Sequence, residues 1–248
     1  MIIPTFRRAG KVTTLKAVSH AALCVTASEE SDYRRHYPDV EIIVHPDTVL
    51  GYSPKAQWIL DRYPNCFLLD DDQPFMVRKY IGTGDARSQK IDPDTAYDII
   101  QQTAATAKEM GAYLFGFSSV PNPVTYHGFK IFRFTGFIVG GACGYLEGGG
   151  LYFDCSFTAV SDFWMALYNA YTNRFCFVDE RYCVSGDSKA QTFESLGGIA
   201  SLRTQETERR DFERLKAYFG KAVDRKSNGP DTIRKMRNPY EKTIHLPY

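Results

Sequence analysis

The first 72 residues alternate four times between short apolar segments of strand length and segments with helical spacing. Connections this short return each strand parallel to the previous one, so the pattern predicts a parallel sheet with helices on its faces. Proline near the start of a segment and serine just before one are typical helix-start signals. The expected strands are 1–3, 22–26, 41–44 and 66–69, and the expected helices are 12–21, 29–36 and 55–62.

Beyond residue 72 the pattern is mixed, with further strands that do not follow a strict strand-helix order. We expect helices at 93–110, with Asp92 as its cap, at about 161–171, capped by Ser161 or Asp162, and at 204–219. Expected strands are 112–117, 130–134, 137–140, 151–157 and 175–179, with a loop at 74–80 and an irregular tail. The predicted fold class is α/β: one Rossmann-like mixed sheet with helices on both faces.

The chain of 248 residues is the length of one large domain, and 44% hydrophobic residues suffice for a core. We divide it provisionally into 1–110, 111–220 and a tail, 221–248. The six cysteines form no CxxC pair, which argues against a zinc site and favours reduced core thiols in a cytosolic protein. No apolar run reaches membrane-spanning length, and the first residues are typical of a strand rather than a signal peptide. We therefore expect a cytoplasmic protein without a membrane partner.

The fourth expected strand ends in three consecutive carboxylates, Asp70, Asp71 and Asp72. In open α/β sheets, ligands bind at the carboxyl ends of the strands. Adjacent carboxylates repel one another, and a hard cation such as Mg²⁺ or Mn²⁺, bridging to a diphosphate, relieves that repulsion. Side chains alternate in extended chain, so Asp70 and Asp72 are expected to share a direction that Asp71 does not. A solvated acidic turn before Pro74 is the alternative.

These features together resemble the GT-A glycosyltransferases, in which an Asp-X-Asp motif holds a divalent metal on a nucleotide-sugar diphosphate. The details are most similar to phage-type TET-associated glycosyltransferases, which are thought to glycosylate 5-hydroxymethylpyrimidines in DNA. The resemblance implies a UDP-sugar donor, Mn²⁺ or Mg²⁺, and DNA carrying 5-hydroxymethylcytosine as acceptor, in the host cytoplasm if the chain is phage-encoded. The stretches that carry it are 3–7, 51–58, 69–72, 161–163, 197–198 and 218–221.

The same resemblance implies roles for individual residues. Asp162 corresponds to the catalytic base of inverting members, although the family often has Glu-Asp where this chain has Ser161-Asp162. Asp72 is the first choice for a metal ligand, with Asp70 on the ribose, the metal or its water shell, His245 as a ligand brought back by the tail, and Asp71 as a donor-side or structural residue. The expected donor contacts are completed by Pro4, Thr5, Phe6, Arg7, Asp47, Lys55 and Lys221.

The net charge of +1 hides an uneven distribution. From Ser201 onward there are 12 Lys/Arg against 7 Asp/Glu, a tail that can meet phosphates or simply form a solvated helix face. Other acceptors remain open: a polysaccharide, a lipid-linked sugar or a protein. A nucleotidyltransferase would share the sheet and the acids but normally begins with a longer Gly- and Arg-rich loop than 4–11. A non-catalytic nucleotide-sugar-binding module is the non-enzyme alternative.

Overall fold

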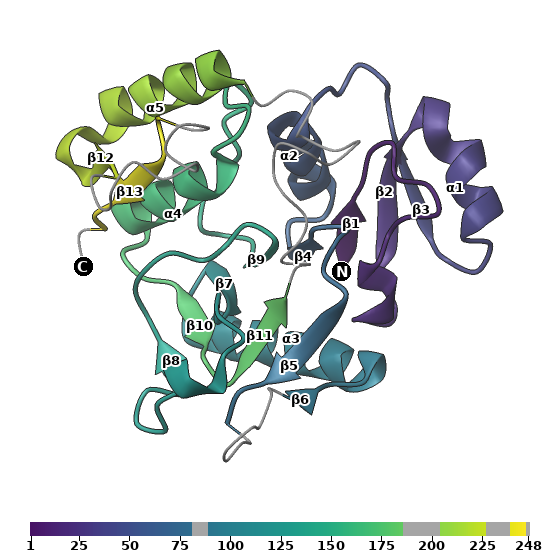
Figure 1. Cartoon of the computed structure of the whole chain (residues 1–248), viewed down its shortest axis with the longest axis horizontal. Coiled ribbons are helices and arrows are strands. Elements are labelled where there is room, and N and C mark those ends of the chain that lie inside the picture. Colours follow the sequence, from purple (N-terminus) through teal and green to yellow (C-terminus); the bar gives the residue numbers. More distant parts are fainter. Residues whose placement is uncertain (81–88, 186–203, 227–238, 247–248) are drawn as a thin grey trace.

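An eight-stranded mixed β-sheet runs through the molecule, in the strand order β3-β2-β1-β4-β9-β7-β10-β8 (Figure 1). The computed structural model describes residues 1–80, 89–185, 204–226 and 239–246. The strands of this sheet are β1 (Ile2–Pro4), β2 (Ala22–Thr26), β3 (Ile42–His45), β4 (Cys66–Leu69), β7 (Leu114–Phe117), β8 (Phe132–Arg133), β9 (Ala142–Tyr145) and β10 (Phe177–Asp179).

The N-terminal half of the sheet is parallel, as the alternating pattern predicts. β1 pairs with β2 on one side and with β4 on the other, and β2 pairs with β3, all in parallel. The chain therefore leaves β1 in one direction, toward β2 and β3, and returns to the opposite side of β1 for β4. That reversal of strand order is a topological switch point, where open α/β sheets form a crevice beyond the carboxyl ends of their strands.

The C-terminal half makes the sheet mixed. β9 runs antiparallel to both of its neighbours, β4 and β7, so its first residues lie at the same edge as the last residues of those strands. β10 is parallel to β7, and the short β8 closes the sheet as an antiparallel edge strand. The start of β9 consequently lies beside the crevice formed by β1 and β4.

Alternation along the strands divides the core between two helix layers. In β4, Phe67 and Leu69 join the cluster that contains Ile99 and Ile100 of α3 (Pro93–Glu109). Leu68 joins the cluster on the opposite face, which contains residues of α2 (Tyr52–Arg62) and α4 (Ser161–Thr172). Successive side chains of a strand point to opposite faces, so both faces are covered by helices. The predicted fold class is confirmed.

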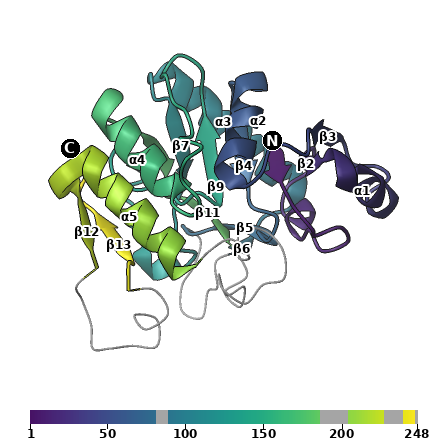
Figure 2. The same ribbon diagram turned by 90° about the horizontal axis from the view of Figure 1, so that it is seen from above.

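Two further units extend the molecule at its ends. α5 (Gln205–Phe219) packs on α4 through Phe212 and Leu215, and the pair β12 (Val223–Arg225) and β13 (Lys242–Ile244) lies beside it. These elements occupy one end of the molecule, and α1 (Glu30–His36) with β3 the other (Figures 1 and 2). A small sheet of β11 (Tyr182–Ser185), β5 (Phe75–Arg78) and β6 (Gln89–Lys90) lies between them.

Several local predictions were wrong, and in each case tertiary contacts decided. Residues 12–21 form only a short 3₁₀ turn, Thr14–Lys16, in place of a helix. The loop expected at 74–80 contains β5, which pairs with β11 from a distant part of the chain. The expected strands 137–140 and 151–157 are irregular, while the tail expected to be irregular forms β12 and β13.

Some cap and burial predictions were also wrong. Neither Ser161 nor Asp162 caps α4: its N-cap is Val160, without a side-chain hydrogen bond. Ser28 bonds Asp47 rather than capping α1, whose N-cap is Glu29. Cys155 is exposed, whereas the other five cysteines are buried free thiols as expected. Asp92 does cap α3, accepting a hydrogen bond from the Thr95 amide. Among the described residues, no helix is long and apolar enough to cross a membrane.

Candidate active site

The carboxyl ends of β1 and β4 bring two of the predicted segments together. Residues 5–8 follow β1 and the aspartate triplet follows β4, and these strands are direct neighbours in the sheet. The loop that leads into β9 reaches the same edge, where the Asp70 amide donates to the carbonyl of Gly141 at 2.9 Å. The switch point therefore gathers acidic, basic and glycine residues within a few strand widths.

Asp71 is held on the side of the sheet that faces α1. Its Oδ2 accepts a hydrogen bond from Thr5 Oγ1 at 2.7 Å, and its Oδ1 pairs with Arg8 Nη1 at 2.6 Å. The Tyr33 hydroxyl shares a hydrogen bond with Thr5 and accepts one from the Arg8 amide. Burial raises the pKa of Asp71, and the contacts with Thr5 and Arg8 oppose that rise. Asp71 thus joins the loop after β1 to the loop after β4, which is a structural role.

Asp70 points to the opposite face, toward α2 and α4. A Cβ atom on Gly141 would lie 3.0 Å from Asp70 Oδ2, so only glycine lets this backbone approach the carboxylate. Burial is the largest cause that raises the pKa of Asp70 to about 7, with smaller contributions from the charges of Asp72, Asp71 and Asp162 and an opposing one from Arg8. A carboxylate whose pKa is shifted by burial and by neighbouring carboxylates is a candidate functional group.

Asp162 approaches the same place from the first turn of α4. It is half-buried, and a Cβ atom on Gly140 would lie 2.9 Å from its own Cβ. Its Oδ1 accepts a hydrogen bond from the adjacent Phe163 amide. The backbone of Gly140 and Gly141 therefore lies against both carboxylates, with Gly140 next to Asp162 and Gly141 next to Asp70. Tyr52, at the start of α2, is near both carboxylates, whose charges add to the burial that raises its pKa.

Lys55, on α2, supports the loop after β1 through a hydrogen bond to its backbone. Its side chain is buried on α2, and Nζ donates to the Thr5 carbonyl at 2.7 Å. Burial lowers its pKa, and the nearby charges of Cys24, Glu29 and Asp71 oppose that change. Phe6 lies within 5.7 Å of Lys55 Nζ and 4.9 Å of the Arg7 guanidinium. Arg7 has a positive φ of 55°, and its amide donates to Glu29. The loop is thus held in one shape, with half-buried Phe6 and exposed Arg7 at its surface.

Asp47 lies beyond β3 at the same edge and is exposed. Its Oδ1 accepts hydrogen bonds from both the amide and the hydroxyl of Ser28, and these bonds lower its pKa. Asp47 is ionised and positioned two strands away from β1, at a distance of about 10 Å by ordinary strand spacing. That separation is on the scale of a nucleoside rather than of a single functional group.

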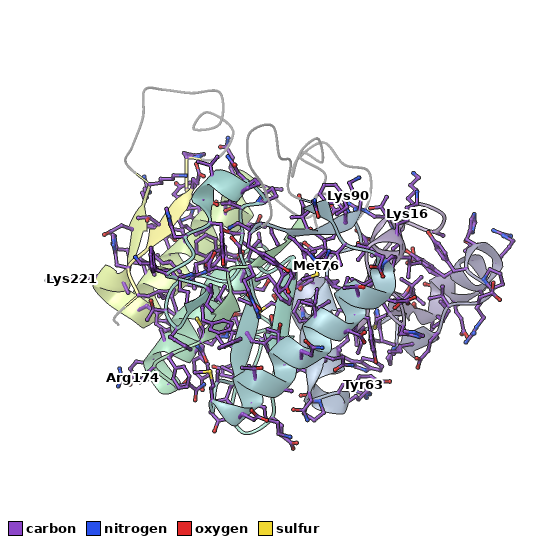
Figure 3. All side chains as sticks on the ribbon, turned by 90° about the horizontal axis from the view of Figure 1, so that it is seen from below. Lys16, Tyr63, Met76, Lys90, Arg174 and Lys221 are labelled. Atoms are coloured by element: carbon purple, nitrogen blue, oxygen red, sulfur yellow. The ribbon has the colours of Figure 1, made fainter. Side chains whose placement is uncertain are left out.

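Lys221 and His245 are not brought to this edge. Lys221 is exposed in the turn after α5, and Figure 3 shows it at the opposite end of the molecule from Lys16. His245 follows β13, where its Nε2 lies 3.9 Å from Asp224. Their predicted contacts with the donor and the metal stay predictions. The pair Gly197-Gly198, one of the stretches behind the resemblance, lies outside the described residues.

The aspartates satisfy the chemistry of a divalent cation in part. Asp70 and Asp72 are hard oxygen ligands of the type that Mg²⁺ and Mn²⁺ prefer, and such ions often take one or two carboxylates plus substrate phosphates. Arg8 Nη1 lies 3.6 Å from Asp72 Oδ2, so the guanidinium neutralises part of the negative charge of the triplet. The described part of the chain has no group of three or more His, Cys, Asp or Glu side chains arranged to hold an ion. Asp70 and Asp72 would therefore supply only part of the ligand set of a divalent cation.

Sequence reasoning missed several residues that build the site. Arg8 and Tyr33 were outside the predicted set, yet both contact the loop that carries Thr5. Thr14 Oγ1 donates to the Asp70 carbonyl and accepts from the Gln73 amide, which holds the acidic turn in place. Gly140 and Gly141 lie against the two key carboxylates. Two consecutive glycines directly before an apolar strand are a signal of close backbone approach that could have identified them.

Comparison with known proteins gives a family. The model of the TET-associated glycosyltransferase family matches residues 1–138, which include β1 to β8, the triplet and Lys55 but not Asp162, Lys221 or His245. No curated protein matches the chain. Among solved structures, the crystal structure of S. aureus TarS 1-349 aligns with 95% of this chain and 75% of its own, at 11% identity and a TM-score of 0.44, too low to add to the assignment. Because the family model spans more than half of the 248 residues, the chain belongs to the TET-associated glycosyltransferase family and is a glycosyltransferase.

Proposed function

We propose that the protein is a metal-dependent glycosyltransferase that moves a sugar from a nucleotide-diphosphate sugar, preferentially a UDP-sugar, to the hydroxyl of 5-hydroxymethylcytosine in DNA. In this proposal Asp162 is the general base, and Asp70 and Asp72 form the binding site for Mn²⁺ or Mg²⁺ on the donor diphosphate. The DNA acceptor rests on the name of the matched family and on the excess of basic residues after Ser201.

One observation carries the proposal: Asp70 and Asp162 lie against the adjacent glycines Gly141 and Gly140, near enough for the charge of Asp162 to raise the pKa of Asp70. Transfer needs a carboxylate that faces the leaving diphosphate and another that faces the incoming hydroxyl. Two such groups must be near each other without sharing one proton or one cation. The two adjacent glycines let the backbone approach both carboxylates at this edge of the sheet.

The chain's own residues suffice for the proton transfer. The acceptor hydroxyl oxygen forms a bond to the anomeric carbon as the bond from that carbon to the phosphate oxygen breaks, and the electron pair leaves with the nucleoside diphosphate. Asp162 accepts the hydroxyl proton, a contribution of about 10²–10⁴-fold for a positioned base. A divalent cation bound by Asp70 and Asp72 would neutralise the negative charge that develops on the leaving diphosphate.

The donor nucleotide is expected along the edge from β3 to β1. Phe6 and Arg7 present an aromatic ring and a cation to a base and a phosphate, on a loop that Lys55 and Thr5 hold rigid. Asp47 is available to a base or ribose at the far end. Lys221 and His245 remain in the proposal as residues of the C-terminal part that would reach the diphosphate or the metal only after a rearrangement of the tail.

The test is transfer onto defined DNA. The protein is incubated with a duplex containing 5-hydroxymethylcytosine, a panel of nucleotide sugars and Mn²⁺, and the nucleosides are analysed by mass spectrometry. We expect a mass increase of one sugar that is lost with a chelator and restored by Mn²⁺ or Mg²⁺. Asp162→Asn should lower kcat by at least about 100-fold with little change in donor affinity. Asp39→Asn, at an exposed carboxylate in the turn before β3, is the matched control and should transfer normally.

Three results would contradict parts of the proposal. Metal-independent transfer would remove the cation from it. Absence of a mass change on any hydroxymethylated base, together with metal-dependent donor hydrolysis, would exclude DNA and leave a polysaccharide, a lipid-linked sugar or a protein as acceptor. Normal kcat in Asp162→Asn would exclude Asp162 as the base.

A further inference from the structure

The loop of residues 118–131 exposes large apolar side chains although it is well structured. Phe129 is fully exposed and Val124 is 83% exposed. Each lies in a hydrogen-bonded turn: Thr125 N donates to the Asn122 carbonyl, and Lys130 N donates to the His127 carbonyl. Asn122 also accepts from the Val124 amide through its side chain. These side chains are therefore presented by an ordered scaffold, and exposed apolar side chains in such a setting mark an interaction site.

The loop carries no negative charge of its own. Residues 110–146 contain neither Asp nor Glu, and the loop itself contributes Lys130 and His127, both exposed. Arg133, just after it, pairs with Glu180 at 2.8 Å and helps to hold the end of the loop. A duplex has a polyanionic backbone and an apolar interior of stacked bases. A loop with apolar side chains at its tip, a basic side chain and no acidic one is complementary to both.

The loop emerges beside the candidate active site. It follows β7, which is separated from β4 in the sheet by β9 alone. Two strand spacings place the origin of the loop about 10 Å from β4. Figure 1 shows β8, which the loop enters, at the outer edge of the molecule. A duplex bound at the start of the loop would therefore lie near the carboxyl end of β4.

The position of the proposed general base, Asp162, requires a way to bring the target nucleotide out of the duplex. Asp162 and Asp70 are both half-buried, next to Gly140 and Gly141. A nucleotide that stays in the base stack cannot bring its hydroxyl to a recessed carboxylate. Enzymes that modify bases extrude the target nucleotide, and apolar side chains inserted between base steps are one way to open the stack.

We propose that the loop 118–131 is a wedge for duplex DNA: Phe129 and Val124 enter the base stack, and Lys130 contacts the phosphate backbone. This inference rests on the DNA acceptor of the proposed function. Behind the tip, the rings of Tyr80 and Tyr126 pack with centroids 6.3 Å apart, and Tyr80 packs on Tyr182 at 5.9 Å. This aromatic cluster supports the loop from the side of the sheet.

The experiment measures binding in the absence of donor. Full-length protein is titrated into a duplex in which 2-aminopurine neighbours one 5-hydroxymethylcytosine, and into the corresponding single strand. Wild type should bind the duplex and raise the 2-aminopurine fluorescence, because unstacking relieves its quenching. Phe129→Ala should weaken duplex binding by about tenfold or more, weaken single-strand binding less, and lose the fluorescence rise. Phe129→Leu should retain most of both signals.

Two further variants distinguish insertion into the base stack from electrostatic binding and from nonspecific apolar binding. Lys130→Ala should weaken binding to all sequences alike and reduce the salt dependence by about one phosphate contact. Met110→Ala removes an exposed apolar side chain at the opposite edge of the sheet and should bind the duplex as wild type does. Thermal melting of each variant confirms that the fold is intact.

The proposal is overturned if Phe129→Ala binds duplex like wild type, or if it loses duplex and single strand equally. It is also overturned if the loop instead mediates binding to vesicles of anionic lipid, lost in Phe129→Ala. The experiments distinguish a failure of the wedge proposal from a failure of the proposed function. A protein that opens the duplex but transfers no sugar to it contradicts the function alone. A protein that transfers sugar to duplex DNA while Phe129→Ala binds normally contradicts the wedge alone.

Discussion

Three consecutive aspartates have three different environments. Asp71 is tied to Thr5 and Arg8, Asp70 is half-buried toward α2 and α4, and Asp72 is half-buried with Arg8 at 3.6 Å. Strand alternation separates Asp70 from Asp71, whereas in the turn after β4 both Asp71 and Asp72 lie near Arg8. Three residues of the same type can therefore have different roles, because the surroundings of each carboxylate determine what it does.

The raised pKa of Asp70 gives a prediction for stability against pH. Its folded pKa of about 7 exceeds the ordinary value of 3.8, so the folded state binds the proton more tightly. This residue's contribution to stability is then complete below pH 3.8 and is lost as the pH rises to about 7. A tenfold change in acidity corresponds to about 1.4 kcal/mol, and each kcal/mol to about 2–4 °C in Tm at this chain length.

Asp70→Asn removes this charge and should raise Tm by several degrees at pH 8 without metal, with a difference from wild type that shrinks toward pH 4. Calorimetry across that range, in chelator, gives the comparison. Asp39→Asn, at an exposed carboxylate, should show no such pH-dependent gain. Equal Tm values for Asp70→Asn and wild type at pH 8 would show that Asp70 is not held in a strained, charged state.

Gly140 and Gly141 give a second prediction at the residue scale. A methyl group at 140 would lie 2.9 Å from the Asp162 Cβ, and one at 141 would lie 3.0 Å from Asp70 Oδ2. Alanine at either position must move a carboxylate by a few tenths of an ångström or more, and a misplacement of 1 Å costs about 100-fold in rate. We expect Gly140→Ala to lower kcat by tenfold or more with little change in donor KM. Steady-state kinetics with unchanged kcat would exclude a spacing role.

At the scale of elements, hydrogen bonds to distant parts of the chain compete with helix formation in residues 12–21. The apolar spacing of this segment is typical of a helix, yet the Thr13 amide and the Thr14 hydroxyl donate to the backbone of the aspartate turn, and the carbonyls of both residues accept bonds within a short 3₁₀ turn. The Ser19 amide likewise donates to the Pro93 carbonyl at the start of α3. These contacts fix a non-helical path that holds the acidic turn against the core. β5 became a strand for a similar reason, since β11 supplies its partner.

Thr14→Val tests this anchor. Loss of the hydroxyl leaves the buried Gln73 amide and the Asp70 carbonyl without this partner, at a cost of about 1–3 kcal/mol. We expect a lower denaturation midpoint and weaker metal-dependent turnover, because the turn that carries Asp70 and Asp72 loosens. Thr13→Val is the matched control, because its hydroxyl makes one long bond of 3.5 Å. Equal destabilisation by both changes would refute the anchor.

At the scale of the whole molecule, the C-terminal part is fastened to the helix that carries Asp162. Lys242 of β13 forms a buried ion pair with Glu208 of α5 at 2.5 Å, and its Nζ lies 5.7 Å from the Phe163 ring. Phe212 and Leu215 of α5 pack with Trp164 of α4. The last described strand therefore contributes to the position of α4, although it is far from the switch point in the chain.

Lys242→Met should destabilise the protein by about 3–5 kcal/mol, because it removes the buried cation that pairs with Glu208. The double variant Glu208→Leu/Lys242→Met should recover most of this loss, since a buried ion pair replaced by apolar residues is often neutral. Arg35→Met, which breaks an exposed pair with Asp32, should cost at most about 1 kcal/mol. Urea denaturation gives the values. A double variant no more stable than Lys242→Met would contradict the argument.

Prediction from the sequence succeeded where local pattern and tertiary context agree. β4 spans the predicted residues, and α3 begins at the predicted cap, because a continuous apolar run and an Asp-Pro start are strong local signals. The acidic triplet was identified because its position after a strand is visible in the chain. Arg8, Thr14 and Tyr33 were not identified, since their importance comes from contacts with residues 25 or more positions away.

By itself, then, the sequence determined the α/β class, the parallel N-terminal half and the delivery of Asp70, Asp71 and Asp72 to a sheet edge. Those properties follow from hydrophobic periodicity and short connections, which act over a few residues. Only the tertiary structure decided that Asp71 bonds Thr5 and Arg8, that Asp70 and Asp162 both lie against Gly140 and Gly141, and that Lys221 and His245 lie in the C-terminal unit. Those outcomes depend on how distant segments pack, and packing selects among local patterns that the chain alone leaves equivalent.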